Sequence, residues 1–148
     1  MSRITACVLC GGGWLETILD MGEMPLPNRL PLPSDPPPDC IVCCEVLEHI
    51  GDPSALLAHL WRVIQPGGCL IVTCAGPGRL PHSGIDGGPL RSGEPYENVD
   101  ATILRGWLVA ARFLHVVITD GPGELDALAD PSQPGDLYAH AWRGEAGA

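Results

Sequence analysis

The sequence contains no lysine, and its eight basic residues are outnumbered by 18 Asp and Glu, giving a formal net charge of -10. Because a phosphate backbone is bound by basic side chains, this charge balance excludes a nucleic acid as the partner. The sequence also lacks an apolar run of about 18 residues, so it predicts no membrane-spanning helix. It does not open with a basic and then apolar leader, and we therefore expect a cytoplasmic protein.

The seven cysteines are odd in number and scattered, which indicates reduced thiols more than a secreted disulfide framework. Residues 25–38 contain seven prolines, and proline removes backbone donors and disfavours regular structure. We therefore predict a Cys- and Pro-rich, irregular N-terminal segment over residues 1–38. Residues 39–148 form the predicted folded domain.

Hydrophobic patterning after residue 38 predicts an α/β fold. The predicted strands are residues 40–44, 69–75, 114–119 and 136–143, and the predicted helices start at Pro53 and at Ala101. The first two strands are uninterrupted apolar runs, typical of a parallel sheet buried on both faces. Asp52 and Asp100 are the expected helix N-caps, and the Pro66-Gly67-Gly68 turn ends the first helix. Residues 76–100 show no periodicity and are predicted to form a long loop.

Two acids and a histidine follow the first predicted strand within five residues: Glu45, Glu48 and His49. Two carboxylates and an imidazole can bind a metal ion, or one of them can act as a general base. The alternative is structural: Glu45 would cap backbone N–H groups at the strand end, and Glu48 and His49 would lie on a solvated first turn. The sequence leaves both interpretations open.

Four polar residues of the long loop are further candidates: Arg79, His82, Asp86 and Tyr96. Loops that follow the carboxyl ends of parallel strands line the ligand crevice of open α/β sheets, so these side chains could face a substrate. They could equally be scattered polar residues of an irregular loop.

Residues 30–143 resemble the C-terminal half of class I S-adenosylmethionine (SAM) dependent methyltransferases. The resemblance rests on Asp39–Ile50, on the Asp52-Pro53 helix start and on Arg62–Gly68, which follow one another in that family's order. It implies a partial Rossmann-like sheet whose strands are equivalent to the family's fourth to seventh, the last being antiparallel. It further implies SAM as cofactor and a small-molecule acceptor. By resemblance, Cys44, Glu45 and Val46 would contact the cofactor, and Glu48 and His49 would be catalytic.

The family's Gly-rich cofactor motif is missing. The Gly11-Gly12-Gly13 run lacks the alternating spacing that lets a backbone approach the ligand, and no strand-terminal acid precedes it. The absent front half would need about two βαβ units of roughly 30 residues each. We therefore expect a truncated methyltransferase with little or no activity as an isolated chain. The alternative is a non-catalytic methyltransferase remnant, or an interaction or zinc-binding module.

The N-terminal segment has its own resemblance. Cys7-x-x-Cys10 and Leu19–Leu30 are similar to the start of the zinc-binding domain that precedes some bacterial sugar C-methyltransferases. That resemblance implies zinc at Cys7 and Cys10. A closed zinc site needs four ligands, and the only other Cys-x-x-Cys pair, Cys40 and Cys43, falls on a predicted strand, where residues three apart point to opposite faces. We therefore expect less than one zinc ion per chain.

A sheet without its front half has an uncovered edge. Unpaired edge strands present free N–H and C=O groups that can pair with another chain. We therefore expect a homodimer formed through this edge, or aggregation of the chain.

Overall fold

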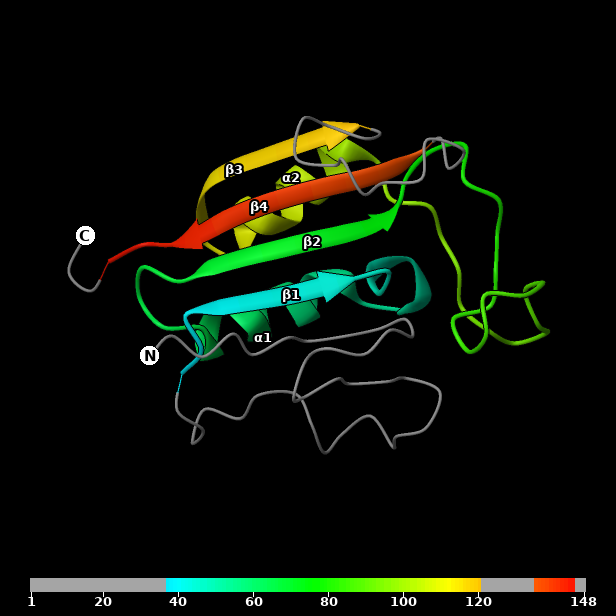
Figure 1. The fold of residues 1–148 in the computed structure, drawn as a ribbon, viewed down its shortest axis with the longest axis horizontal. Coiled ribbons are helices and arrows are strands. Elements are labelled where there is room, and N and C mark those ends of the chain that lie inside the picture. Colours follow the sequence, from blue (N-terminus) through cyan, green and yellow to red (C-terminus); the bar gives the residue numbers. More distant parts are fainter. Residues whose placement is uncertain (1–36, 121–134, 146–148) are drawn as a thin grey trace.

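The computed structural model describes residues 37–120 and 135–145, which form a mixed α/β fold (Figure 1). In chain order the elements are β1 (Cys40–Cys44), the 3₁₀ turn η2 (Leu47–His49), α1 (Pro53–Val63), β2 (Cys69–Ala75), α2 (Ala101–Ala110), β3 (Phe113–Asp120) and β4 (Asp136–Arg143). The predicted strands and helices are confirmed, with bounds that differ by a few residues. The predicted N-terminal segment and its Cys7-x-x-Cys10 pair lie outside the described residues.

The four strands form one sheet in the order β1-β2-β4-β3. β1 and β2 are parallel, with Cys40 opposite Cys69 and Cys44 opposite Thr73. β4 lies between β2 and β3 and is antiparallel to both. This is the partial Rossmann-like sheet that the resemblance implied, including its antiparallel last strand.

Both helices begin where their capping residues predict. Asp52 Oδ1 accepts a hydrogen bond from the Ala55 N–H (2.9 Å), and Pro53 occupies the first helical position. The Asp100 carboxylate likewise accepts from the Thr102 N–H at 2.7 Å. Such caps satisfy N–H groups that have no partner within the helix.

The turn between α1 and β2 is the one that the sequence predicts. The Gly68 N–H donates to the Gln65 carbonyl (2.9 Å), and Gly67 between them has φ +77°. Proline followed by a residue with positive φ is the type II pattern, and only glycine adopts that conformation without strain.

The sheet is fully buried on one face only, so the expectation that its first two strands are buried on both faces is wrong. Burial alternates along β1, where Ile41 and Cys43 are buried and their neighbours are half-buried. In β2, Ile71 is 39% exposed while Leu70 and Val72 are buried. The physical reason is that α1 and α2 both pack behind the sheet (Figure 1) and cover the same face.

The helix-covered face carries the hydrophobic core. α1 contributes Leu57, Leu60 and Val63, and α2 contributes Leu104 and Leu108. This packing fixes the carboxyl ends of β1 and β2 relative to the loop that precedes α2. None of the helices in residues 37–120 and 135–145 has the length and hydropathy needed to span a bilayer.

The expected homodimer stays a prediction, and β1 is the strand through which we expect it. Among the described strands only β2 pairs with β1, which leaves the outer side of β1 as a sheet edge. Sedimentation velocity over a concentration series should show dimers. Val42→Pro, which places a proline in the edge strand, should weaken association. A monomer at all concentrations would contradict the prediction.

Candidate functional site

The chain turns sharply where β1 ends. Glu45 follows Cys44 directly and has φ +53°, in the left-handed region that few residues other than glycine adopt. Its N–H donates to the Thr73 carbonyl of β2 (2.8 Å), which fixes the turn against the sheet. Val46, the next residue, is buried. Strained backbone conformations cluster at ligand sites. Glu45 is the middle one of the three residues, Cys44–Val46, that are predicted to contact the cofactor.

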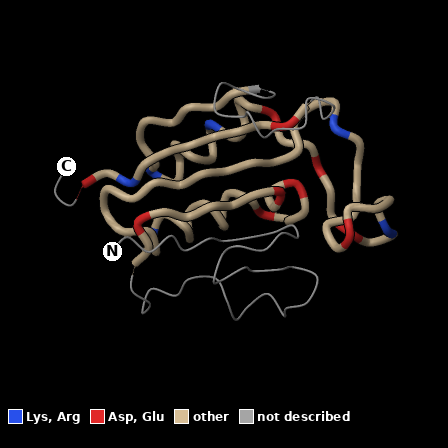
Figure 2. Tube along the Cα trace, viewed as in Figure 1, with Lys and Arg blue, Asp and Glu red and all other residues tan. Residues whose placement is uncertain are grey.

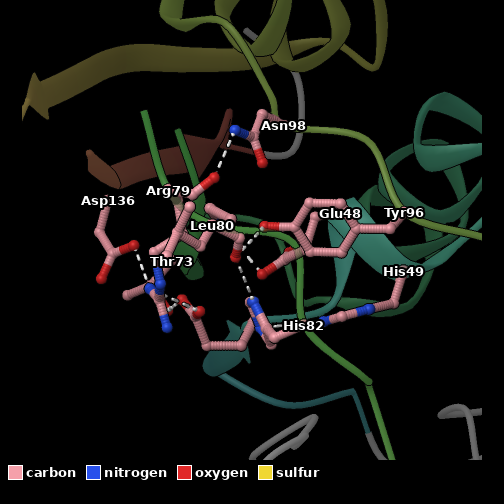
Figure 3. A network of polar contacts seen from close by, with 11 residues as sticks. Glu48, His49, Thr73, Arg79, Leu80, His82, Tyr96, Asn98 and Asp136 are labelled. Carbon is pink, nitrogen blue, oxygen red and sulfur yellow. Dashed lines mark hydrogen bonds and ion pairs between the residues drawn. The ribbon is translucent and has the colours of Figure 1, made fainter. Parts of the chain in front are cut away.

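The Glu45 carboxylate belongs to an ion-pair network around Arg79, whose pairing with Asp136 is drawn in Figure 3. Its Oε1 accepts from the Thr73 hydroxyl (3.0 Å), and its Oε2 lies 3.4 Å from Arg79 Nη1. The same guanidinium nitrogen also pairs with Asp136 at the start of β4. Arg79 therefore links the ends of β1 and β4 through two carboxylates, all with side chains less than one-fifth exposed.

Glu48 is buried on η2, with only 1% of its surface exposed. Its Oε1 accepts from the Ala75 N–H at the end of β2 (3.1 Å), whereas its Oε2 has no hydrogen-bond partner among the described residues. Burial, and secondarily the nearby charge of Glu45, raises the pKa of Glu48 to about 8. A buried carboxyl oxygen without a hydrogen-bond partner lowers the stability of the fold. Its presence in the interior therefore needs an explanation.

His49 lies beside Glu48 in a cluster of three rings. The His49 and His82 Nε2 atoms are 3.3 Å apart, and the two rings meet edge-on at 4.9 Å. The Tyr96 ring contacts both, with centroid distances of 5.2 Å to each. Burial and the neighbouring His82 lower the pKa of His49, which favours the neutral imidazole. Burial raises the pKa of Tyr96 to about 12, so the phenol keeps its proton.

The end of the long loop is fastened over these residues by backbone hydrogen bonds. The Glu97 N–H donates to the Glu48 carbonyl (2.9 Å), and the Val99 N–H donates to the Ala75 carbonyl (2.8 Å). At Gly84, an added Cβ would lie 3.0 Å from the His49 ring, so the close approach of loop and ring favours a glycine. The loop is therefore part of the site.

The structure shows where the candidate residues of the sequence analysis lie. Three of the four loop candidates, Arg79, His82 and Tyr96, join the cluster, as a crevice-lining loop predicts. The fourth, Asp86, lies apart and pairs with Arg91 at an exposed position. The interpretation of Glu48 and His49 as a solvated first turn is wrong, because both are buried.

A cleft of about 270 Å³ opens next to Glu48 on the side of the helices. Apolar and aromatic side chains, among them Leu47, Tyr96 and Trp107, line much of it, and Glu48 and Glu97 supply acidic groups. Among the described residues that line it, the charged ones are both acidic. These residues suit a small, largely apolar molecule better than an anionic one.

The strand interpretation of the Cys40 and Cys43 pair is confirmed. Cys43 is buried under the helices, and Cys40 lies half-buried on the opposite face. Within the described strand the two thiols therefore point to opposite faces of the sheet.

The comparison with protein families gives one match for this chain. The family described as "Methyltransferase domain" matches residues 16–108. No curated protein sequence matches significantly.

Solved structures share the fold. A SAM-dependent methyltransferase from Mesorhizobium loti is 16% identical, with a TM-score of 0.54 over 86% of this chain and 68% of its own. The [4+2]-cyclase SpnF is 17% identical, with a TM-score of 0.55 over 80% of this chain and 53% of its own. Phosphoethanolamine N-methyltransferase 2 from Haemonchus contortus, solved with SAM, is 13% identical, with a TM-score of 0.51 over 73% of this chain and 34% of its own. Thus this chain spans about a third of the Haemonchus protein and about half of SpnF.

Arg79→Met should destabilise the fold, because it leaves the Glu45 and Asp136 carboxylates without their shared cation. Losing charge-assisted hydrogen bonds at these partly buried positions should lower the free energy of unfolding by about 1–3 kcal/mol, measured by urea denaturation. Arg91→Met is the matched control, because Arg91 and its partner Asp86 are more than half exposed, and such pairs contribute little. Equal midpoints for both variants and the parent would contradict this prediction.

Proposed function

The chain belongs to the methyltransferase-domain family, and we propose that it supplies part of a site at which a methyl group passes from SAM to a small-molecule acceptor. The observation that carries the proposal is the buried pair Glu48 and His49 at the carboxyl edge of the parallel strands β1 and β2. Ligands of open α/β sheets bind outside this edge.

The chemistry of this edge fits the methionine end of SAM, which carries a cationic sulfonium and an ammonium group. Acidic residues gather where β1 ends (Figure 2), and Glu48 keeps one oxygen without a hydrogen-bond partner. Cys44, Glu45 and Val46 would hold this end of the cofactor. The oxygens of Glu45 already have Thr73 and Arg79 as partners, so backbone groups of this turn are the expected contacts. When bound, SAM supplies the electrophilic methyl group.

Glu48 and His49 would act on the acceptor. Glu48 lines the cleft, so an acceptor seated there would lie beside η2, on which His49 is the next residue. A neutral imidazole can take the proton that an acceptor hydroxyl or amine loses when it is methylated. The apolar walls would hold the acceptor and exclude water, and positioning is the main requirement of a direct displacement.

The affinity for SAM should be low in the isolated chain. The sequence lacks the family's Gly-rich cofactor motif and the ribose-binding acid that ends the family's second strand. In the family, these two features supply the contacts to adenosine. Each charge-assisted hydrogen bond lost is worth about 1.5–3 kcal/mol, and every 1.4 kcal/mol is about tenfold in the dissociation constant. We therefore expect a dissociation constant in the millimolar range by calorimetric titration, and no turnover. A micromolar value would contradict this expectation.

A binding map tests the function itself. In a titration of the isotope-labelled chain followed by NMR, SAM and S-methylmethionine should both shift the amide signals of Cys44–Val46. Adenosine is the control and should leave these signals unchanged, because it lacks the sulfonium and the amino-acid group. If millimolar SAM shifts no signal at the end of β1, the proposal fails and the alternative of a non-catalytic remnant or interaction module is favoured.

A further inference from the structure

We propose that Glu48, His49 and His82 form a binding site for one divalent transition-metal ion. One ligand atom from each residue lies within 4.8 Å of the other two. Two imidazoles and one carboxylate are a ligand set typical of zinc and of non-haem iron, cobalt or manganese sites. The site stands whether or not the chain transfers methyl groups.

The spacing of the two imidazoles matches coordination to a single ion. A metal–nitrogen bond of about 2.0–2.1 Å and a tetrahedral angle put two nitrogen ligands about 3.3–3.4 Å apart. The Nε2 atoms of His49 and His82 are 3.3 Å apart and share a hydrogen bond that the ion would replace. A Glu48 carboxylate oxygen lies within 4.8 Å of both nitrogens and would move inward to reach the same ion.

His82 is held as a metal-binding histidine usually is. Its Nδ1 lies 3.2 Å from the Leu80 carbonyl, which can only accept, so Nδ1 donates and the Nε2 lone pair faces His49. A hydrogen bond from the second ring nitrogen to a carbonyl fixes the tautomer and the orientation of a ligand. The edge-on Tyr96 ring contacts both imidazoles and fixes their planes further.

A bound cation would also explain why one oxygen of Glu48 has no hydrogen-bond partner. Its Oε2 is buried and has no hydrogen-bond partner among the described residues. Arg79 is shared between Glu45 and Asp136. Its charge is therefore already balanced, and a metal ion would take the place of the Glu48 proton and give the carboxylate a cationic partner. Three protein ligands leave further coordination positions open, where water or an added oxygen ligand would bind.

The test is a titration of the full-length chain with Co²⁺ alone, after treatment with EDTA. Cys7→Ser and Cys10→Ser are introduced first, so that this thiol pair cannot contribute. Calorimetry should give one Co²⁺ per chain, and the visible spectrum should be that of a nitrogen and oxygen site without thiolate bands. Bound Co²⁺ should also raise the melting temperature.

His82→Ala should weaken Co²⁺ binding by more than about 100-fold, because even loss of a supporting second-shell partner typically costs about 10–100-fold. His82 lies in the loop between β2 and α2, so this variant should keep the far-ultraviolet circular dichroism of the parent. Glu48→Gln keeps the side-chain shape and should weaken binding as well. His140→Ala, a histidine of β4 beside Trp142, is the matched control and should bind as the parent does.

Two outcomes would overturn the proposal. One is a parent chain that binds no Co²⁺ at millimolar concentration. The other is a folded His82→Ala variant that binds as tightly as His140→Ala. Neither bears on SAM binding, which the NMR titration tests separately.

Discussion

The parallel pairing of β1 with β2 is the constraint on which the site depends. With Cys44 opposite Thr73, both strands end at one edge of the sheet, and the segments that follow them are forced to meet there. Glu45 and Glu48 come from the first segment, and Arg79 and His82 come from the second. An antiparallel pair would send the second segment to the opposite edge, and the cluster could not form.

The sheet divides the molecule into two unlike surfaces. One face is sealed by α1 and α2. The other presents rows of cross-strand neighbours such as Val42, Ile71, His140 and Val117, with no Asp, Glu or Arg in that row. A sheet with parallel strands normally has both faces covered, and Ile71 and Val117 are 39% and 44% exposed here. Within residues 37–120 and 135–145, the exposed positions of this face and the outer side of β1 both belong to a sheet of four strands with helices on one face.

Most of the fold could be predicted from local signals. Asp52 with Pro53, the Pro66-Gly67-Gly68 turn and the apolar runs at residues 40–44 and 69–75 each act over a few residues, and each is confirmed. The site could be predicted only in part. Glu48 and His49 were visible as an acidic and imidazole pair, but their burial depends on a loop end that packs over them. Asp136 was missed as a partner of Arg79, because 57 residues separate them and no periodicity marks such a contact.

The edge of the sheet combines two features that each cost folding free energy. A residue other than glycine at positive φ costs of the order of 1–3 kcal/mol, and Glu45 is such a residue. A buried acceptor without a partner costs about 1–3 kcal/mol more, and Glu48 Oε2 is such an acceptor. Neither feature improves the core, which Leu57, Leu60 and Leu104 help to form on the helix-covered face of the sheet. Costs gathered at one edge, where Glu48 lies within 4.8 Å of two imidazoles, are most simply explained by a ligand that relieves them when it binds. A cationic ligand does so for Glu48 by giving its free oxygen a partner of opposite charge.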